Sequence, residues 1–361
     1  MPTASHLPSD RSARLADLLG VDHPIVQGPF GGGLSRAGLT AAVADKGGLG
    51  SFGAEALTPG EIEQTARDIR ARTDKPFNLN LWVSRADAGG SRPEPADLAR
   101  AWSLFKPYFE ELGLPRPDFS GRPPILFTDQ ADAVLAARPA VFSFVFGIPP
   151  VAVLRECRRL GIATMGAATS VAEAEALDAA GVDVIIATGS EAGGHRVSFL
   201  GRAEDQLMGT FALTQLVARR VTTPVVAAGG IADGPGVRAA QALGAAGVQV
   251  GTAFLACVES GADDLHRAAL FGPAAQRTDL SRAVTGRLAR CLANRWLDEM
   301  ADRTADIAPF PVQGWFFSKL KAAAVAAGRT DFHALYGGQI AANLRHRRAA
   351  DLMDDLIAGA A

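Results

Sequence analysis

Short apolar runs alternate with stretches of helical spacing over the first 260 residues or so of the chain. The run from Val182 to Ala187 is typical, because it is bounded by turn residues and is followed by an amphipathic stretch. Such alternation predicts parallel strands that are covered by helices. Eight runs of this kind are present, at residues 24–28, 49–53, 77–83, 140–146, 161–166, 182–187, 224–228 and 247–251.

The number of these runs favours a closed sheet over an open one. Eight strand–helix units in roughly 230 residues match the size of a (β/α)8 TIM barrel. An open, doubly wound sheet is the alternative, and it calls for a Gly-x-Gly-x-x-Gly turn after the first strand. The stretch from Gly28 to Gly33 lacks that spacing. We therefore predict an α/β protein, a TIM barrel with an inserted segment and a small C-terminal helical subdomain.

Three segments depart from the alternation and divide the chain. Residues 1–19 begin with a polar stretch that lacks the pattern of a secretory signal, and we expect a flexible leader. Residues 20–260 form the barrel, with a Pro- and Gly-rich insertion at 84–123 around one amphipathic helix. Residues 261–361 have mostly helical spacing and predict a helical extension or cap packed on the barrel. Helices are expected in this part at 281–303 and 332–358, among others.

Composition excludes several classes of protein. A formal net charge of -2 gives no basic excess for nucleic acid, and the 48% hydrophobic content fits a well-buried globule. No apolar run approaches the ~20 residues that span a bilayer. Cys157, Cys257 and Cys291 are far apart, and neither they nor the histidines show metal-ligand spacing. We expect three buried thiols, no metal and a cytoplasmic location.

Glycines follow the last two strands of the predicted barrel. The active site of such a barrel lies at the carboxyl ends of its strands, and the loops after strands seven and eight commonly bind phosphate. Gly229 and Gly230 follow the seventh strand, and Gln249, Val250, Gly251 and Thr252 close the eighth. Because the strand ends carry no lysine and few carboxylates, we expect a phosphate-bearing cofactor rather than a phosphorylated substrate.

The third and sixth strands contribute the remaining candidate residues. Asn80 ends the third strand, where its amide suits either the edge of a heterocycle or a cap on its own turn. Thr188 ends the sixth strand and is followed by Gly193, Gly194 and His195. Glycines there let the backbone approach a ligand, and a histidine can give or take a proton near neutral pH. His195 is therefore the candidate catalytic residue.

Several segments together resemble the nitronate monooxygenase family, also called 2-nitropropane dioxygenases. The resemblance covers roughly residues 20–345 and includes two segments of the C-terminal part, 285–290 and 335–339. The segments that carry it are Gln27-Gly28-Pro29-Phe30, Asn78-Leu79-Asn80-Leu81, Thr188-Gly189-Ser190-Glu191-Ala192-Gly193-Gly194-His195-Arg196, Ala228-Gly229-Gly230-Ile231 and Gln249-Val250-Gly251-Thr252.

The resemblance implies an FMN-dependent barrel with His195 as the catalytic residue over the flavin. The phosphate is expected on Gly230 and the segment from Gln249 to Thr252. The other residues expected at the flavin are Gly28, Pro29, Phe30, Asn80, Thr188, Gly193, Gly194 and Gly229. The chain departs from the family at two of these positions, because the family usually has Gln where Thr188 stands and often has Met where Phe30 stands.

The implied activity is the oxidation of alkyl nitronates, or of nitroalkanes, by O2 to a carbonyl compound and nitrite. Glu191 is expected to hold its loop, through His195 or through a backbone N–H. Two alternatives stay open: an NAD(P)H-dependent flavin reductase of the enoyl-thioester type and a non-catalytic FMN-binding protein. The expected partners are a small-molecule substrate and O2, without nucleic acid or membrane. A homodimer is an open question.

Overall fold

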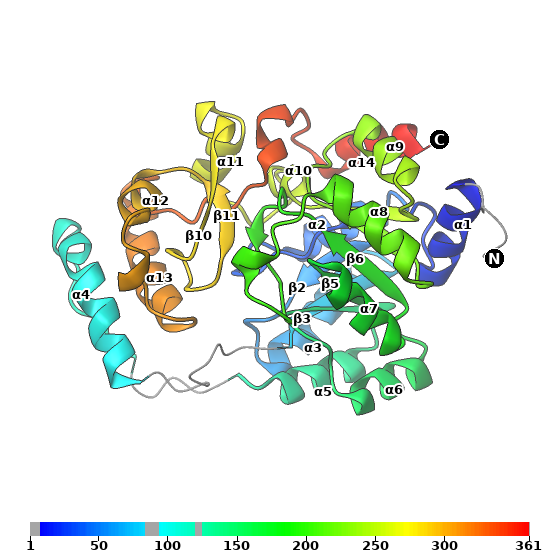
Figure 1. Ribbon diagram of the computed structural model, residues 1–361, viewed down its shortest axis with the longest axis horizontal. Coiled ribbons are helices and arrows are strands. Elements are labelled where there is room, and N and C mark those ends of the chain that lie inside the picture. The colour runs from blue at the N-terminus through cyan, green and yellow to red at the C-terminus, as the bar shows by residue number, and fades with distance from the viewer. Residues whose placement is uncertain (1–7, 84–93, 120–124, 361) are drawn as a thin grey trace.

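Eight parallel strands close into a barrel, which confirms the predicted (β/α)8 TIM fold (Figure 1). The computed structural model describes residues 8–83, 94–119 and 125–360. The sheet order is β1-β9-β8-β6-β5-β4-β3-β2, and parallel hydrogen bonds between β1 and Leu49 join its two ends. The strands are β1 (Ile25–Gln27), β2 (Gly50–Gly53), β3 (Phe77–Trp82), β4 (Val141–Val145), β5 (Ala163–Ala168), β6 (Val184–Thr188), β8 (Val225–Ala228) and β9 (Gly247–Val250).

Helices cover the outside of the barrel. Some of them begin at a side-chain cap: Thr58 and Glu61 form a capping box at α3, and the Asp233 side chain caps α9. All but one of these helices were expected from the sequence, and the exception is α5. The helices are α2 (Ala37–Ala44), α3 (Pro59–Arg70), α5 (Phe127–Ala137), α6 (Val151–Leu160), α7 (Val171–Ala179), α8 (Thr210–Arg220) and α9 (Gly234–Ala242).

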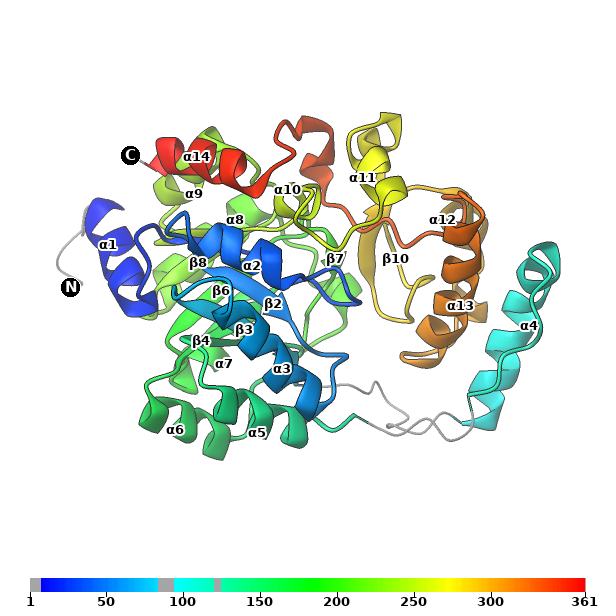
Figure 2. The same cartoon turned by 180° about the vertical axis from the view of Figure 1, so that it is seen from behind.

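The eighth place in this helical layer is taken by the far end of the chain. Helix α14 (Ala349–Ala360) packs against α9 and α2 (Figure 2), with Leu352 and Leu356 buried in a cluster that also holds Leu39 and Val237. The residues between β9 and α14 are therefore an excursion within the last βα unit. The expected long helix at 332–358 was wrong, because its first half holds only the short 3-10 turn η4 (Gln339–Asn343).

The expected flexible leader was also wrong in part. Residues 1–7 lie outside the described residues, but α1 (Pro8–Leu19) is a helix whose Leu15 and Leu19 are buried. These side chains belong to the cluster that contains Val26 of β1, and Leu15 lies directly against Gly247, the first residue of β9. Helix α1 therefore covers the amino end of the barrel, opposite the strand ends that carry the candidate site.

The excursion contains strands as well as helices. Strands β10 (Thr278–Ser281) and β11 (Ala289–Leu292) form a hairpin, and β11 also pairs with β7 (Gly194–His195). The helix expected over 281–303 was therefore wrong, apart from α12 (Arg295–Met300). This small sheet matters for the site because it places Ala289 beside His195. Whether the chain divides into separate units at residue 260 stays a prediction.

The inserted segment at 84–123 packs on this same excursion. Its helix α4 (Pro95–Glu111) was expected, whereas residues 84–93 and 120–123 of the insertion lie outside the described residues. Phe105 of α4 stacks on Trp296 of α12, with ring centroids 5.0 Å apart, and on Phe316 of α13 (Val312–Ala326), at 5.6 Å. These rings build a second core, and we call the excursion and α4 together the cap.

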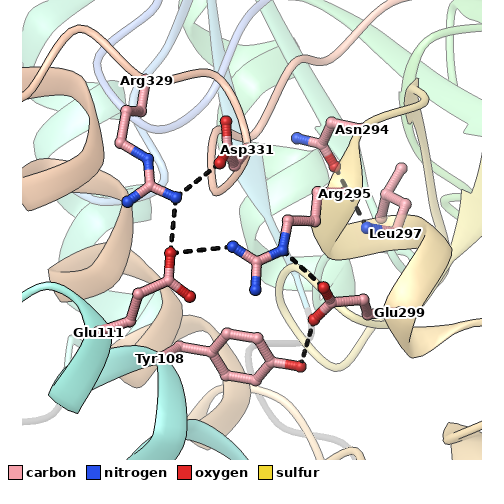
Figure 3. Close-up of polar contacts among 8 residues, drawn as sticks. All are labelled: Tyr108, Glu111, Asn294, Arg295, Leu297, Glu299, Arg329 and Asp331. Carbon is pink, nitrogen blue, oxygen red and sulfur yellow. Dashed lines mark hydrogen bonds and ion pairs between the residues drawn. The ribbon is translucent and has the colours of Figure 1, made fainter.

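Polar contacts also tie α4 to the rest of the cap (Figure 3). The Glu111 carboxylate accepts hydrogen bonds from Arg295, at 2.9 Å, and from Arg329, at 2.6 Å. Tyr108 donates to the Glu299 carboxylate at 2.7 Å. All the charged partners are about one-third exposed, so each pair contributes modestly and the buried rings supply most of the stability.

The three cysteines confirm the expectation of buried free thiols. Cys157, Cys257 and Cys291 are each unpaired and shielded from solvent. Desolvation raises the pKa of the Cys157 thiol to about 11 and that of the other two to about 12. No helix in the part of the chain that the structure describes is both long and apolar enough to cross a bilayer.

Candidate active site

A cavity of about 320 Å³ opens at the carboxyl ends of the barrel strands. Twelve of the thirteen residues predicted to bind the cofactor line it, together with His195. The exception is Val250, whose side chain is fully buried in the outer core and whose carbonyl accepts a hydrogen bond from Gly28. The lining residues among those predicted are Gly28, Pro29, Phe30, Asn80, Thr188, Gly193, Gly194, His195, Gly229, Gly230, Gln249, Gly251 and Thr252.

One end of the cavity is built from backbone. Gly229 and Gly230 have φ values of +107° and +71°, which side chains rarely adopt, so glycine is required to turn the chain there. Thr252 lies beside them, and its Oγ1 accepts a hydrogen bond from Gly338 N–H at 2.9 Å, which leaves the hydroxyl proton free to donate. This glycine-lined end has the character of an anion cradle.

The middle of the cavity carries side-chain amides. Asn80 is buried, and its Nδ2 donates to Ser143 Oγ at 2.9 Å, so its amide is held by a neighbouring strand. Gln249 borders the cavity, and its buried Oε1 has no hydrogen-bond partner among the described residues. A buried polar atom without a protein partner is the state expected of a group whose partner belongs to a ligand. The amides and the cradle thus fit a ligand with a polar heterocycle and an anionic tail.

The opposite end of the cavity holds His195. Its Nε2 lies 2.8 Å from Thr285 Oγ1, and its ring packs edge-on against Trp82, with centroids 5.0 Å apart. The side chain is half-buried and lines the cavity. Desolvation, aided by the positive charge of Arg287, lowers the pKa of His195 to about 3. The imidazole is therefore neutral near pH 7, with one nitrogen that donates and one that accepts.

Arg287 lies behind this histidine in an aromatic enclosure. Its guanidinium carbon is 4.1 Å from the ring centroid of Phe146 and 4.2 Å from that of Phe310. The side chain is only 5% exposed. A positive charge held in so little water projects its potential into the neighbouring cavity more strongly than a solvated one. The Arg287 charge acts on the histidine end of the cavity, where it contributes to the lowered pKa of His195.

Glu191 holds the loop that carries the glycines and the histidine. Its carboxylate accepts from Thr210 N–H at 2.8 Å and from Thr210 Oγ1 at 3.0 Å, and its carbonyl accepts from Gln339 N–H at 2.9 Å. Of the two expected anchors, the backbone N–H is the one observed. Arg196 is fully buried and donates to the carbonyls of Thr188 and Gly189, which fixes the other side of the loop.

Several residues of the site were not identified from the sequence. Thr285 and Tyr336 reach the cavity from the cap, and Glu55 and Trp82 reach it from the barrel. Thr285 and Tyr336 stand within segments that carry the family resemblance, which was the available signal, but no local feature gave them a role. Glu55 accepts from Gly32 N–H at 3.0 Å and so shapes the loop after β1.

The fold and the cavity define a TIM-barrel enzyme whose strand ends bring a glycine-lined cradle, two side-chain amides and a histidine into one cavity. The model of the family described as nitronate monooxygenase matches residues 12–359, and the chain belongs to that family. A nitronate monooxygenase of Paraburkholderia phytofirmans is 43% identical to this chain, over 95% of this chain and 93% of its own length.

Solved structures support the same assignment. Nitroalkane oxidase from Streptomyces ansochromogenes superimposes with a TM-score of 0.87 at 36% identity, covering 96% of this chain and 97% of its own. FabK from Thermotoga maritima is less similar, with a TM-score of 0.72 at 28% identity, covering 96% and 95% of the two chains.

Among the described residues, no group of acidic, histidine or cysteine side chains has the arrangement of a metal site.

Proposed function

We propose that this protein is an FMN-dependent nitronate monooxygenase that oxidises alkyl nitronates, and more slowly nitroalkanes, with O2 to a carbonyl compound and nitrite. The observation that carries the proposal is the pairing, in one cavity, of a glycine-lined anion cradle with a neutral histidine beside a buried arginine. Family membership gives the reaction class, and the cavity supplies residues for each part of it.

The cofactor proposal rests on the lining residues. Gly229, Gly230, Gly251 and Thr252 would hold the phosphate, and Asn80 and Gln249 would face the edge of the flavin ring. Gly28, Phe30, Thr188, Gly193 and Gly194 lie where the ring would pass. When bound, the flavin supplies the electron-accepting chemistry that protein side chains lack.

The chain's own residues bind and orient the substrate. The neutral His195 can donate a hydrogen bond to a nitronate oxygen through a protonated ring nitrogen, and Arg287 adds a favourable potential for the anion. With a neutral nitroalkane, the same ring must first accept the α-proton. Loss of this proton converts the nitroalkane into its nitronate, so both substrates then present the same anion to the site. Trp82 and Tyr336 flank the ring.

The test compares the wild type with His195→Asn. Purified protein is expected to be yellow and to release nitrite from a nitronate without NADH or NADPH. The variant is expected to keep its flavin and to lose most of the nitrite release from a neutral nitroalkane, whose α-proton the histidine must accept, since general acid–base catalysis contributes roughly 100- to 10,000-fold. Unchanged nitrite release by His195→Asn would refute the proposed role of the histidine.

Anaerobic stopped-flow separates this proposal from the two alternatives. A nitronate is expected to bleach the flavin rapidly, and NADPH is not. Rapid bleaching by NADPH alone would point to a reductase, and bleaching by neither would point to a binding protein. A cytoplasmic location fits the three free thiols. The use of O2 is measured by oxygen consumption, and a homodimer stays a prediction for sedimentation analysis.

A further inference from the structure

The hydrogen bond between Thr285 and His195 joins the cap to the barrel across 90 residues of sequence. Thr285 stands in the loop between β10 and β11, and His195 is the second residue of β7. Because Nε2 of His195 is 2.8 Å from Thr285 Oγ1, the nitrogen left for the substrate is Nδ1. The loop therefore engages one of the two imidazole nitrogens, Nε2.

The Thr285 loop is held firmly enough to fix the ring. Arg282 donates to the Gly286 carbonyl at 2.8 Å and forms an ion pair with Glu204 at 2.7 Å. The carbonyl of Ala283 accepts from Gln313 at 2.7 Å and from the Trp296 indole at 3.1 Å. With Ala283 and Gly286, on the two sides of Thr285, each held by a hydrogen bond, the Thr285 hydroxyl is presented at a defined position.

The surroundings of Thr285 let its hydroxyl either donate or accept. Arg287 N–H lies 3.3 Å from Oγ1 and can donate to it, and the Arg287 carbonyl lies 3.4 Å away and can accept from it. When the hydroxyl donates to Nε2, Nδ1 carries the ring proton. When Nε2–H donates to the hydroxyl oxygen, Nδ1 presents a lone pair to the cavity.

We propose that Thr285 is a positioning residue that supports both tautomers of His195, so that Nδ1 can either donate a hydrogen bond to a nitronate or take the α-proton from a neutral nitroalkane. The inference rests on the proposed function. In the second case the C–H bond breaks, its electron pair stays on the substrate as the nitronate, and the proton moves to Nδ1. The ring becomes an imidazolium whose Nε2–H donates to Thr285 Oγ1.

Two substrates distinguish these roles. A preformed nitronate needs only a neutral ring that donates, whereas a nitroalkane needs a ring that becomes charged. A hydrogen bond to a charged group contributes more than one between neutral groups. Thr285→Val is therefore expected to lower kcat/KM roughly 10- to 150-fold for nitroethane but only roughly 2- to 12-fold for ethyl nitronate. Thr285→Ser keeps the hydroxyl and is expected to restore both values.

Two further readouts separate positioning from simple loss of structure. The kinetic isotope effect with α-deuterated nitroethane is expected to rise in Thr285→Val, because proton abstraction becomes slower than the other steps. Flavin content and the thermal midpoint show whether the variant is folded. Equal losses for the two substrates, or no rescue by Thr285→Ser, would overturn the proposal.

Histidine NMR tests the hydrogen bond without turnover. In protein labelled with ¹⁵N-histidine, the two ring nitrogens of His195 are assigned by the signals that disappear in His195→Asn. The Nε2 signal is expected to shift in Thr285→Val and not in Thr285→Ser, and an unshifted signal in the valine variant would overturn the inference. Wild-type protein that releases no nitrite from either substrate would instead refute the proposed function, while the NMR comparison would still decide whether Thr285 binds His195.

Discussion

Gly193→Ala is expected to force apart the two backbones that meet at the roof of the cavity. A Cβ built at Gly193 lies 2.6 Å from Gly338 N and 2.7 Å from the carbonyl carbon of Gly337. The approach is equally tight from the facing segment, because a Cβ at Gly338 would lie 2.7 Å from the Glu191 carbonyl oxygen. Both neighbours are backbone atoms, so no side chain can rotate away.

The size of the effect follows from that approach. Restoring ordinary contact distances of about 3.5 Å requires the two backbones to separate by about 0.9 Å. Overpacking of this kind costs about 1–3 kcal/mol in free energy of unfolding. It also endangers the hydrogen bond from Gln339 N–H to the Glu191 carbonyl, now 2.9 Å. Since His195 is two residues from the substitution, its shift by such a distance is expected to reduce kcat roughly 100-fold.

The assay measures three quantities on Gly193→Ala and on Gly60→Ala as the control. A Cβ at Gly60, in helix α3, would have no neighbour within 4 Å. The Gly193 variant is expected to show a lower thermal midpoint, less flavin retained after desalting and slower nitrite release, and the control is expected to match the wild type. A Gly193→Ala protein that keeps its midpoint, its flavin and its activity would show that the two backbones can separate freely, and the reasoning would fail.

Two other predictions concern charge. In Glu111→Gln, amide hydrogen exchange of α4 is expected to become faster at pH 7, equivalent to a loss of about 1 kcal/mol, with Glu110→Gln as the matched neighbour. Hydrogen bonds from Arg295 and Arg329 lower the pKa of Glu111 below 4.5, so the carboxylate stabilises the fold at neutral pH and loses this effect as the pH falls below 4.5. The difference in exchange rate between Glu111→Gln and the wild type should therefore disappear in acid. A difference that persists there would contradict the prediction. In Arg287→Met, loss of the positive charge is expected to raise the pKa of His195, so that the acidic limb of the pH–rate profile with nitroethane lies at higher pH than in the wild type. The KM for nitronate is also expected to rise. An acidic limb at the wild-type position would exclude Arg287 as a cause of the lowered histidine pKa.

The barrel was predictable because its strands carry their own local signal. Each strand is a short apolar run between turn residues, and this is the sequence pattern typical of parallel strands that are buried on both faces. The glycine-rich strand ends followed once the barrel order was known, and so did His195. Val250 does not line the cavity because neighbouring residues of a strand face opposite sides, so that Gln249 lines the cavity and the Val250 side chain faces the outer core. Its contact with the cofactor stays a prediction.

The cap was harder to predict because its structure depends on distant partners. Residues Ala289–Leu292 contain good helix formers, yet they form β11 because β10 and β7 supply hydrogen bonds on both sides. Likewise, nothing local marks α14 as the eighth barrel helix. The spacing of its apolar residues would be the same for packing on the barrel as for packing on the cap. Its place against α9 and α2 follows only from closure of the barrel.

The same dependence on distant partners explains why the chemistry of His195 could not be assigned from the sequence. A Gly-Gly-His turn identifies a candidate base but leaves its protonation and its tautomer open. Here the charge that helps to keep the ring neutral comes from Arg287, and the hydroxyl that orients it comes from Thr285, both on the β10–β11 loop. Because β7 is a strand of the same small sheet, the pairing that builds the cap also brings this loop to the histidine. Changes in the cap are therefore expected to alter the histidine's chemistry even where they touch no part of the barrel.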